Sequence, residues 1–249
     1  MKNKKSLGQH WLKNRVILDY IADEAVSDDT ICLEIGPGLG TLTASLLKRF
    51  PKVIAVEYDE KLAENLPKSF PGTNLEVINA DFLDFDLLSI KDPYVVVGNI
   101  PYYITSPIIT KLLAAKNSPV KIVLLIQKEV AERIAAPVGK HTYLSLFVQN
   151  FASVTLGDVI PRAEFTPPPK VDSQVIILTP HTPVIDEKTL KFAKIGFSQP
   201  RKKLAAILAA SHHLNKSEAR EALKKANLSP DIRPAELSHL DWQNLQKVI

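Results

Sequence analysis

Hydrophobic residues in the first 150 positions alternate between short apolar runs and longer helical repeats. The short runs are rich in β-branched residues and apolar on both faces, as in strands buried on both sides. They cover Ile31–Ile35, Val53–Glu57, Leu75–Asn79, Tyr94–Val97 and Ile122–Ile126. Helical repeats separate them at Leu42–Phe50, Lys61–Phe70, Pro107–Lys116 and Lys128–Ala136. This alternation predicts a doubly wound α/β fold with a mostly parallel sheet, whose ligands bind at the carboxyl ends of the strands.

The pattern changes after residue 183. Two further apolar runs, Ala152–Val159 and Ser173–Leu178, predict a closing pair of strands. Only helical repeats follow, at Lys188–Gly196, Arg201–Ser211, Ser217–Ala226 and Ala235–Val248. We therefore predict a large α/β domain over residues 1–183 and a small helical domain over 184–249. Asn215 or Ser217 is the expected cap of the third of these helices.

The composition is that of an ordinary soluble globular protein, with 45% hydrophobic and 23% charged residues. No apolar run approaches the roughly 20 residues that cross a bilayer, and the first residues do not resemble a signal peptide. We expect a cytoplasmic protein with no membrane partner. The single cysteine, Cys32, excludes an internal disulfide and a cysteine-rich metal site, and we predict no metal.

Basic residues are concentrated towards the two ends of the chain. Residues 180–249 hold 12 Lys and Arg against 7 Asp and Glu, whereas residues 1–179 hold 19 against 20. A second cluster consists of Lys2, Lys4, Lys5, Lys13 and Arg15. Such clusters attract a polyanion through counterion release, although a solvated helix surface would have the same composition.

A glycine-rich turn follows the first predicted strand. Gly36, Gly38 and Gly40 lie in the segment GluIleGlyProGlyLeuGly (34–40), directly before a predicted helix. Glycines there let a ligand lie close to bare backbone. Nucleotide-binding dehydrogenases also have such a turn, so the glycines alone do not identify the ligand.

Three acidic residues at successive strand ends narrow the choice of ligand. Glu57 ends the second strand, where a carboxylate can accept both hydroxyls of a ribose. Glu34 precedes the glycines, where its charge would repel a pyrophosphate. Asp81 follows the third strand and can accept a hydrogen bond from an adenine amino group. S-adenosylmethionine has no phosphate and carries an ammonium and a sulfonium, so it suits these acids better than a dinucleotide does.

The segment AsnIleProTyr (99–102) follows the fourth strand and reaches the same edge of the sheet. The amino nitrogen of adenine is a poor nucleophile because its lone pair is delocalised into the ring. Acceptors on both of its N–H groups, the Asn99 side-chain oxygen and the Ile100 carbonyl, would favour a tetrahedral nitrogen. Pro101 fixes the backbone, and Tyr102 offers a face on which the base can stack. A plain turn is the alternative, since Asn and Pro are common turn formers.

A second aromatic residue, Phe165, precedes three prolines in PheThrProProProLysValAspSer (165–173). A stiff loop could hold its ring against the other face of a flipped base, or the ring could pack into the core. The chain shows no Ser/His/Asp or Cys/His constellation. Its six histidines are scattered, and we expect His212–His213 to be surface residues of a helix.

Together these motifs resemble the KsgA/RsmA family of ribosomal RNA adenine dimethyltransferases. The resemblance rests on segments in the family's order, at residues 4–12, 34–43, 56–59, 80–81, 98–104, 127–134 and 165–173. AsnIleProTyr is shared with other amino-methyltransferases, and its combination with the N-terminal LysLysSerLeuGlyGln and the proline loop is specific.

The resemblance implies a Rossmann-like class I methyltransferase that dimethylates two adjacent adenines near the 3′ end of small-subunit ribosomal RNA. It implies a monomer whose helical domain docks the RNA. It implies S-adenosylmethionine contacts at His10, Leu12, Gly36, Glu57, Asp81 and Asn99. The family usually has AsnPhe where this chain has His10–Trp11, so the first of these contacts departs from the pattern.

Three other functions fit parts of the sequence. An erythromycin-resistance methyltransferase would modify one adenine in large-subunit ribosomal RNA with the same catalytic segment. A non-enzymatic RNA-binding assembly or transcription factor could share the fold, although the intact AsnIleProTyr argues against lost chemistry. A dehydrogenase would need a residue that handles a hydride, and the sequence offers no candidate.

Overall fold

The computed structural model describes residues 10–211 and 214–249. Lys2, Lys4 and Lys5, residues 4–9 of the N-terminal motif and the pair His212–His213 lie outside these residues. The chain divides into two compact units. One runs to Ala131 and includes Ser153–Pro180, and the other comprises Glu132–Ala152 and His181–Ile249.

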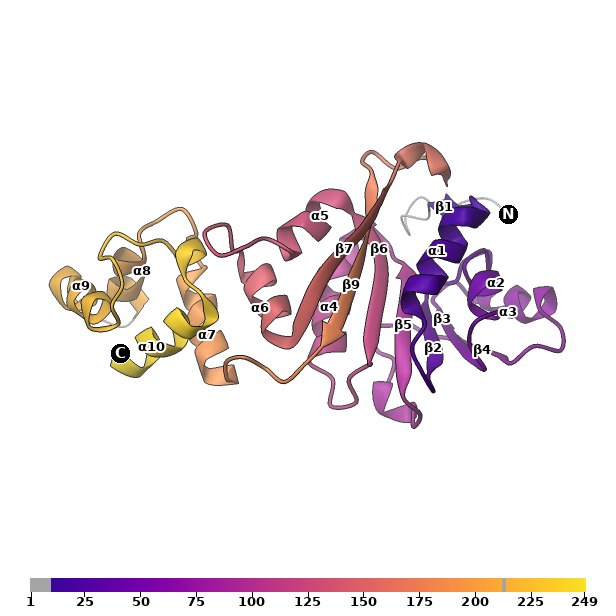
Figure 1. Ribbon diagram of the computed structural model, residues 1–249, viewed down its shortest axis with the longest axis horizontal. Helices are drawn as coiled ribbons and strands as arrows, with labels where there is room; N and C mark the ends of the chain where they lie inside the picture. Colours follow the sequence, from indigo (N-terminus) through magenta and orange to yellow (C-terminus); the bar gives the residue numbers. More distant parts are fainter. Residues whose placement is uncertain (1–9, 212–213) are drawn as a thin grey trace. The chain divides into compact units, whose positions relative to one another are not determined.

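The first unit is built on a seven-stranded sheet with the order β4-β3-β2-β5-β6-β9-β7. Strands β2 to β6 pair in parallel, and β9 runs antiparallel to β6 (Figure 1). The strands are β2 (Ile31–Ile35), β3 (Val53–Glu57), β4 (Leu75–Asn79), β5 (Tyr94–Asn99), β6 (Lys121–Gln127), β7 (Ala152–Ile160) and β9 (Ser173–Pro180). Every residue of β2 and β3 is buried, as expected for parallel strands covered on both faces. The predicted doubly wound fold is confirmed.

The helices of this unit follow the predicted order, apart from one additional helix before β2. They are α1 (Arg15–Ala25), α2 (Thr43–Leu46), α3 (Glu60–Ser69), α4 (Thr105–Leu113) and α5 (Lys128–Ile134), with 3-10 turns η2 (Leu87–Ser89), η3 (Tyr102–Ile104) and η4 (Arg162–Glu164). Asp59 caps α3 by accepting a hydrogen bond from the Lys61 backbone N–H at 3.1 Å. The regular part of α2 is shorter than predicted, but helical hydrogen bonds from Leu47 and Phe50 extend the turn beyond it.

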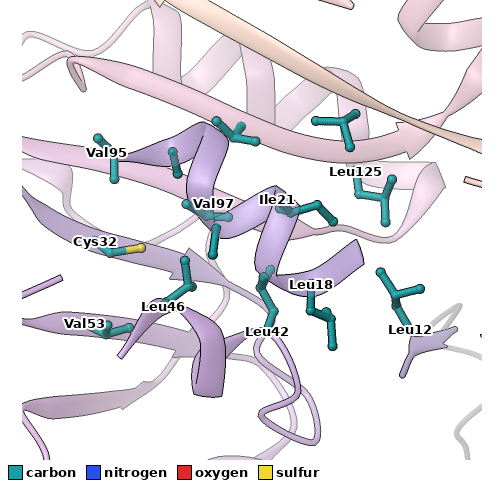
Figure 2. Close-up of a cluster of buried hydrophobic side chains, with 14 of the residues drawn as sticks. Leu12, Leu18, Ile21, Cys32, Leu42, Leu46, Val53, Val95, Val97 and Leu125 are labelled. Carbon is teal, nitrogen blue, oxygen red and sulfur yellow. The ribbon is translucent and has the colours of Figure 1, made fainter. Parts of the chain in front are cut away.

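Helix α1 was not among the predicted elements, yet it covers the centre of the sheet. Leu18 and Ile21 on its buried face belong to one hydrophobic cluster with Cys32, Val97 and Leu125 (Figure 2). Burying aliphatic side chains of this size contributes about 1.5–3 kcal/mol each. Leu18, Ile21, Ala22 and Ala25 recur at positions i, i+3, i+4 and i+7 on the buried face, and this spacing is a helical signal in the sequence.

A separate two-stranded sheet joins the N-terminal segment to the proline loop. β1 (Trp11–Leu12) pairs antiparallel with β8 (Phe165–Thr166), with Trp11 opposite Thr166 and Leu12 opposite Phe165. This pairing brings the two ends of the first unit's sequence to one place.

The second unit is helical. It contains α6 (Tyr143–Phe151), α7 (Glu187–Gly196), α8 (Leu204–Ser211), α9 (Lys216–Lys225), α10 (His239–Val248) and the turn η5 (Pro234–Glu236). Trp242 is fully buried at its centre, and its ring lies 6.0 Å from that of Phe192 and 5.7 Å from that of Phe197. Asn215 caps α9 in a capping box with Glu218, which decides between the two predicted caps.

The division of the chain differs from the predicted boundary at residue 183 in one segment. Residues 132–152, with helix α6, group with the C-terminal helices. Leu146 of α6 explains the difference, because it is fully buried in the same hydrophobic cluster as Trp242. In the described ranges, no helix has the length and apolar character needed to span a bilayer.

Candidate active site

A cavity of about 300 Å³ lies at the carboxyl ends of the parallel strands of the first unit. This is the edge at which doubly wound sheets bind ligands, and the volume suits a small molecule. Nine of the ten predicted site residues line it: His10, Leu12, Gly36, Glu57, Asp81, Asn99, Ile100, Pro101 and Tyr102. The tenth, Phe165, is not among the lining residues.

The turn after β2 exposes backbone to this cavity. Gly36, Gly38 and Gly40 all have positive φ angles, of +63°, +58° and +79°, which side chains rarely tolerate. A Cβ on Gly40 would lie 2.7 Å from Leu66 Cδ1 of α3, so this glycine permits close packing of the helix. A Cβ on Gly36 would meet no atom within 4 Å, so this glycine leaves open space beside the backbone.

Glu57 is held in place at the end of β3 by two backbone donors. Its Oε2 accepts a hydrogen bond from the Gly38 N–H at 3.0 Å, and its Oε1 accepts one from the Asp59 N–H at 2.8 Å. The side chain is buried, and burial raises its pKa above the ordinary value. Each carboxylate oxygen keeps a further lone pair, so the group can still accept a hydroxyl.

Glu34 differs from the charged acid that the sequence analysis expected before the glycines. Its side chain is 1% exposed, and its Oε2 accepts a hydrogen bond from the Thr43 hydroxyl at 2.7 Å. Burial raises the pKa of Glu34 to about 8, against the opposing effect of the Thr43 bond. The carboxyl is therefore mostly neutral at pH 7. A neutral Glu34 would not repel a phosphate by charge, contrary to the expectation from the sequence.

Asp81 occupies an exposed turn after β4. Its Oδ1 accepts a hydrogen bond from the Leu83 N–H at 2.8 Å, and its backbone carbonyl accepts one from the Phe85 N–H at 3.0 Å. These bonds wind the turn around Asp81. A carboxylate can accept about four hydrogen bonds, so capacity remains for a ligand in the cavity.

Asn99 is oriented by the N-terminal segment. Its Nδ2 donates a hydrogen bond to the His10 carbonyl at 3.1 Å. This bond engages the donor end of the amide, so the Oδ1 acceptor is available to a substrate. The arrangement is the one that the predicted acceptor role of Asn99 needs.

His10 and Tyr102 form the aromatic wall of the cavity. The two rings stack with centroids 6.2 Å apart and planes inclined by 21°. His10 Nδ1 lies 2.7 Å from the Pro167 carbonyl, and because a carbonyl only accepts, this nitrogen carries the proton. The Tyr102 hydroxyl is hydrogen-bonded to the Ser173 hydroxyl at 2.8 Å. Both rings are thus fixed by the segment that follows β8.

Comparison with known proteins agrees with this geometry. The family model described as ribosomal RNA adenine dimethylase matches residues 1–249. The chain is 38% identical to the ribosomal RNA small subunit methyltransferase A of Dehalococcoides mccartyi, over 98% of this chain and 88% of that one. The chain belongs to the ribosomal RNA adenine dimethylase family. It is therefore an enzyme, an S-adenosylmethionine-dependent methyltransferase that acts on adenine.

Solved structures support this assignment. A dimethyladenosine transferase from Plasmodium falciparum is 32% identical and superposes with a TM-score of 0.81, over 95% of this chain and 96% of that one. The 23S rRNA methyltransferase ErmE is 27% identical with a TM-score of 0.74, over 96% and 98% of the two chains. The resemblance inferred from the motifs is confirmed.

Phe165 lies outside the cavity that the other nine predicted site residues line. The residue is 3% exposed and packs in the hydrophobic cluster that contains Leu12 and Leu18. The pairing of β8 with β1 places Phe165 opposite Leu12, on the side of the core. Of the two roles considered for this ring, the structure shows core packing, and it does not bring the ring to the cavity.

Three aromatic residues that the sequence analysis did not single out also line the cavity, namely Tyr58, Phe82 and Tyr103. Tyr103 is 64% exposed and Tyr58 is 63% exposed, an unusual degree of exposure for large aromatic side chains. Each follows directly after a predicted site residue, and this adjacency is the sequence feature that could have indicated its place in the cavity wall. Within residues 10–211 and 214–249, no group of three or more His, Cys, Asp or Glu side chains could hold a metal ion.

Proposed function

We propose that this dimethylase transfers methyl groups from S-adenosylmethionine to two adjacent adenines near the 3′ end of small-subunit ribosomal RNA. Each adenine amino group would receive two methyl groups during ribosome assembly in the cytoplasm. The observation that carries the proposal is the orientation of Asn99. Its amide nitrogen donates a hydrogen bond to the His10 carbonyl, which would leave its acceptor oxygen available to the substrate.

The residues around the cavity fit S-adenosylmethionine. Gly36 leaves space for the ligand against bare backbone, Glu57 would accept the ribose hydroxyls, and Asp81 would accept the adenine amino group. His10, Leu12 and Asn99 would contact the remainder of the molecule. When bound, this cofactor supplies a methyl group made electrophilic by the positive sulfur.

Residues 99–102, which we call the acceptor segment, would bind and orient the target base. The Asn99 Oδ1 and the Ile100 carbonyl would accept the two N–H groups of the adenine amino nitrogen, so that its lone pair points at the methyl group. The nitrogen becomes acidic only after alkylation, so no base is needed beforehand. Catalysis would come from positioning and from preorganised dipoles.

Tyr102 would hold the plane of the base. Stacking on an aromatic ring contributes about 1–3 kcal/mol per base. Because the Tyr102 hydroxyl is bonded to Ser173, its ring is already in place before the base arrives. This lowers the entropic cost of binding.

The helical unit would dock the ribosomal RNA. Its C-terminal part, residues 180–249, carries the basic excess of the chain, which suits a polyanion. We expect the enzyme to act as a monomer. The similarity to ErmE makes a large-subunit adenine the second candidate substrate, and the higher identity to the dimethyladenosine transferase favours the first.

The test uses labelled S-adenosylmethionine and small ribosomal subunits from a strain that lacks its own dimethylase, with large subunits as the control. Mass mapping should find dimethyladenine at two adjacent positions in the small subunit. Label in the large subunit alone would instead identify the resistance-type activity. Absence of label despite cofactor and subunit binding would refute methyl transfer to this assembly state.

A further inference from the structure

Lys111 connects helix α4 to the turn that carries Asp81. The residue lies near the end of α4, which begins two residues after Tyr103, and it is half-buried. Its ammonium group donates hydrogen bonds to the carbonyls of Leu83 and Phe85, both at 2.6 Å. The same group lies 5.6 Å from the centroid of the Phe82 ring. One side chain thus makes three contacts with a single turn.

The contacted turn forms one wall of the cavity. Asp81, Phe82 and Leu83 all line it. The turn's own hydrogen bonds join residues two to four positions apart, from Leu83 and Phe85 back to Asp81. Such short-range bonds fix the shape of the turn and leave its position to longer-range contacts. Lys111 supplies such a contact, across 28 and 26 positions of sequence.

The chemistry of these contacts makes them strong. Hydrogen bonds from a charged ammonium are roughly twice as strong as those between neutral groups, and partial burial reduces competition from water. A cation over an aromatic ring adds a further attraction. The surrounding carboxylates of Asp81, Asp84 and Asp86 raise the pKa of Lys111, while burial, the larger effect, lowers it. The turn therefore carries negative charge close to the Lys111 ammonium, which is hydrogen-bonded to it.

We infer that Lys111 is a positioning residue for S-adenosylmethionine, acting through the turn that presents Asp81. The inference rests on the proposed cofactor role of Asp81. Lys111 touches neither the reacting atoms nor the base; it sets where the Asp81 carboxylate stands relative to the glycine turn and Glu57. Because α4 continues from the acceptor segment, the same side chain also ties the cofactor wall of the cavity to the wall that holds the base.

The experiment measures the Kd of S-adenosylhomocysteine by calorimetry for the full chain and its variants. Lys111→Met removes the donors at nearly constant length and should raise the Kd at least about tenfold, whereas Lys111→Arg keeps charge and donors and should stay within about threefold. Lys116→Met makes the same change at an exposed lysine just beyond α4 and should leave the Kd unchanged.

A double-mutant cycle with Asp81→Ala tests the route of the effect. If Lys111 acts through Asp81, adding K111M to D81A should raise the Kd little further. A folded K111M protein with the wild-type Kd, or fully additive effects in the cycle, would overturn the inference. Should K111M not fold, Lys111→Gln and K111R support the same comparison.

The cofactor titration needs no RNA, so its outcome is separate from the transfer assay. Cofactor binding that depends on Lys111 in a protein that does not methylate small subunits would uphold this inference and refute the proposed substrate. A wild-type protein that does not bind S-adenosylhomocysteine would refute the role of Lys111 together with the cofactor assignment.

Discussion

The two sides of the cavity are built in different ways. On the cofactor side, which consists of the turns with Glu34, Glu57 and Asp81, the hydrogen bonds to these three carboxyl groups join residues 2 to 19 positions apart, and Lys111 adds bonds to the Asp81 turn across 28 and 26 positions. The base side consists of residues 99–103, and its supporting bonds join residues 71, 89 and 157 positions apart. The carboxyl groups of the first side are therefore held mainly by nearby parts of the chain. The second side takes up its observed geometry only when the N-terminal segment and the proline loop are packed against it.

This difference predicts where substitutions act. A change on the cofactor side should alter a nearby ligand contact and little else, apart from the long-range anchor at Lys111. A substitution in the N-terminal segment or the proline loop, which support the base side, should reduce the free energy of unfolding or the rate of methyl transfer although the residue does not contact the substrate. Four variants test this contrast.

Phe165→Ala should lower the free energy of unfolding by about 3–5 kcal/mol, because it leaves a cavity in the core. Phe165→Leu should cost much less, since most of the buried volume is kept. Urea denaturation of both variants measures the difference. Wild-type stability of the alanine variant combined with a loss of methyl transfer would return Phe165 to the base-stacking role.

Asn99→Ala should reduce methyl transfer about 100- to 1000-fold, the usual effect of removing one preorganised polar group from a reacting centre. Stability should change little, because the residue is only partly buried. The measurement is the initial rate of label incorporation into small subunits, with Asn65→Ala on the exposed face of α3 as control. Equal rates in the two variants would remove Asn99 from the reaction.

Glu34 should make stability depend on pH. Its pKa is about 8 when folded and near 4.5 when unfolded, so folding takes up a proton between these values. The stability that neutral Glu34 contributes is fully present below pH 4.5 and is lost as pH rises through about 8. Relative to the wild-type protein, Glu34→Gln should therefore gain about 4 kcal/mol of stability between pH 5 and pH 9. Parallel pH profiles for the two proteins would contradict this pKa.

Tyr102→Ala should weaken transfer by about 1–3 kcal/mol through lost stacking. Tyr102→Phe keeps the ring and removes only the hydroxyl bond to Ser173, so its effect should be about 1 kcal/mol. The ratio of kcat/KM for small subunits between the two variants separates stacking from positioning. If both variants lose the same amount, the hydroxyl and not the ring is the functional part.

Short-range patterns predicted much of the molecule. The buried strand Val53–Glu57 was predicted to the residue because its run of apolar residues is bounded by polar ones. The glycine turn and the acids after successive strands could also be predicted to lie together, because the carboxyl ends of parallel strands meet at one edge of the sheet. Helix α1 was missed although its apolar spacing was present, and helix α6 was not predicted either.

The fold class, the family and the edge of the sheet at which the chemistry lies could be predicted from the sequence alone. These depend on periodicity and on side-chain types at fixed spacing, which are local properties. Three features became clear only from the three-dimensional packing: Phe165 lies in the core, Glu34 is buried, and Lys111 is hydrogen-bonded to the Asp81 turn. Each of these depends on what a distant segment contributes to the residue's surroundings, and burial and hydrogen-bond partners are set by that packing.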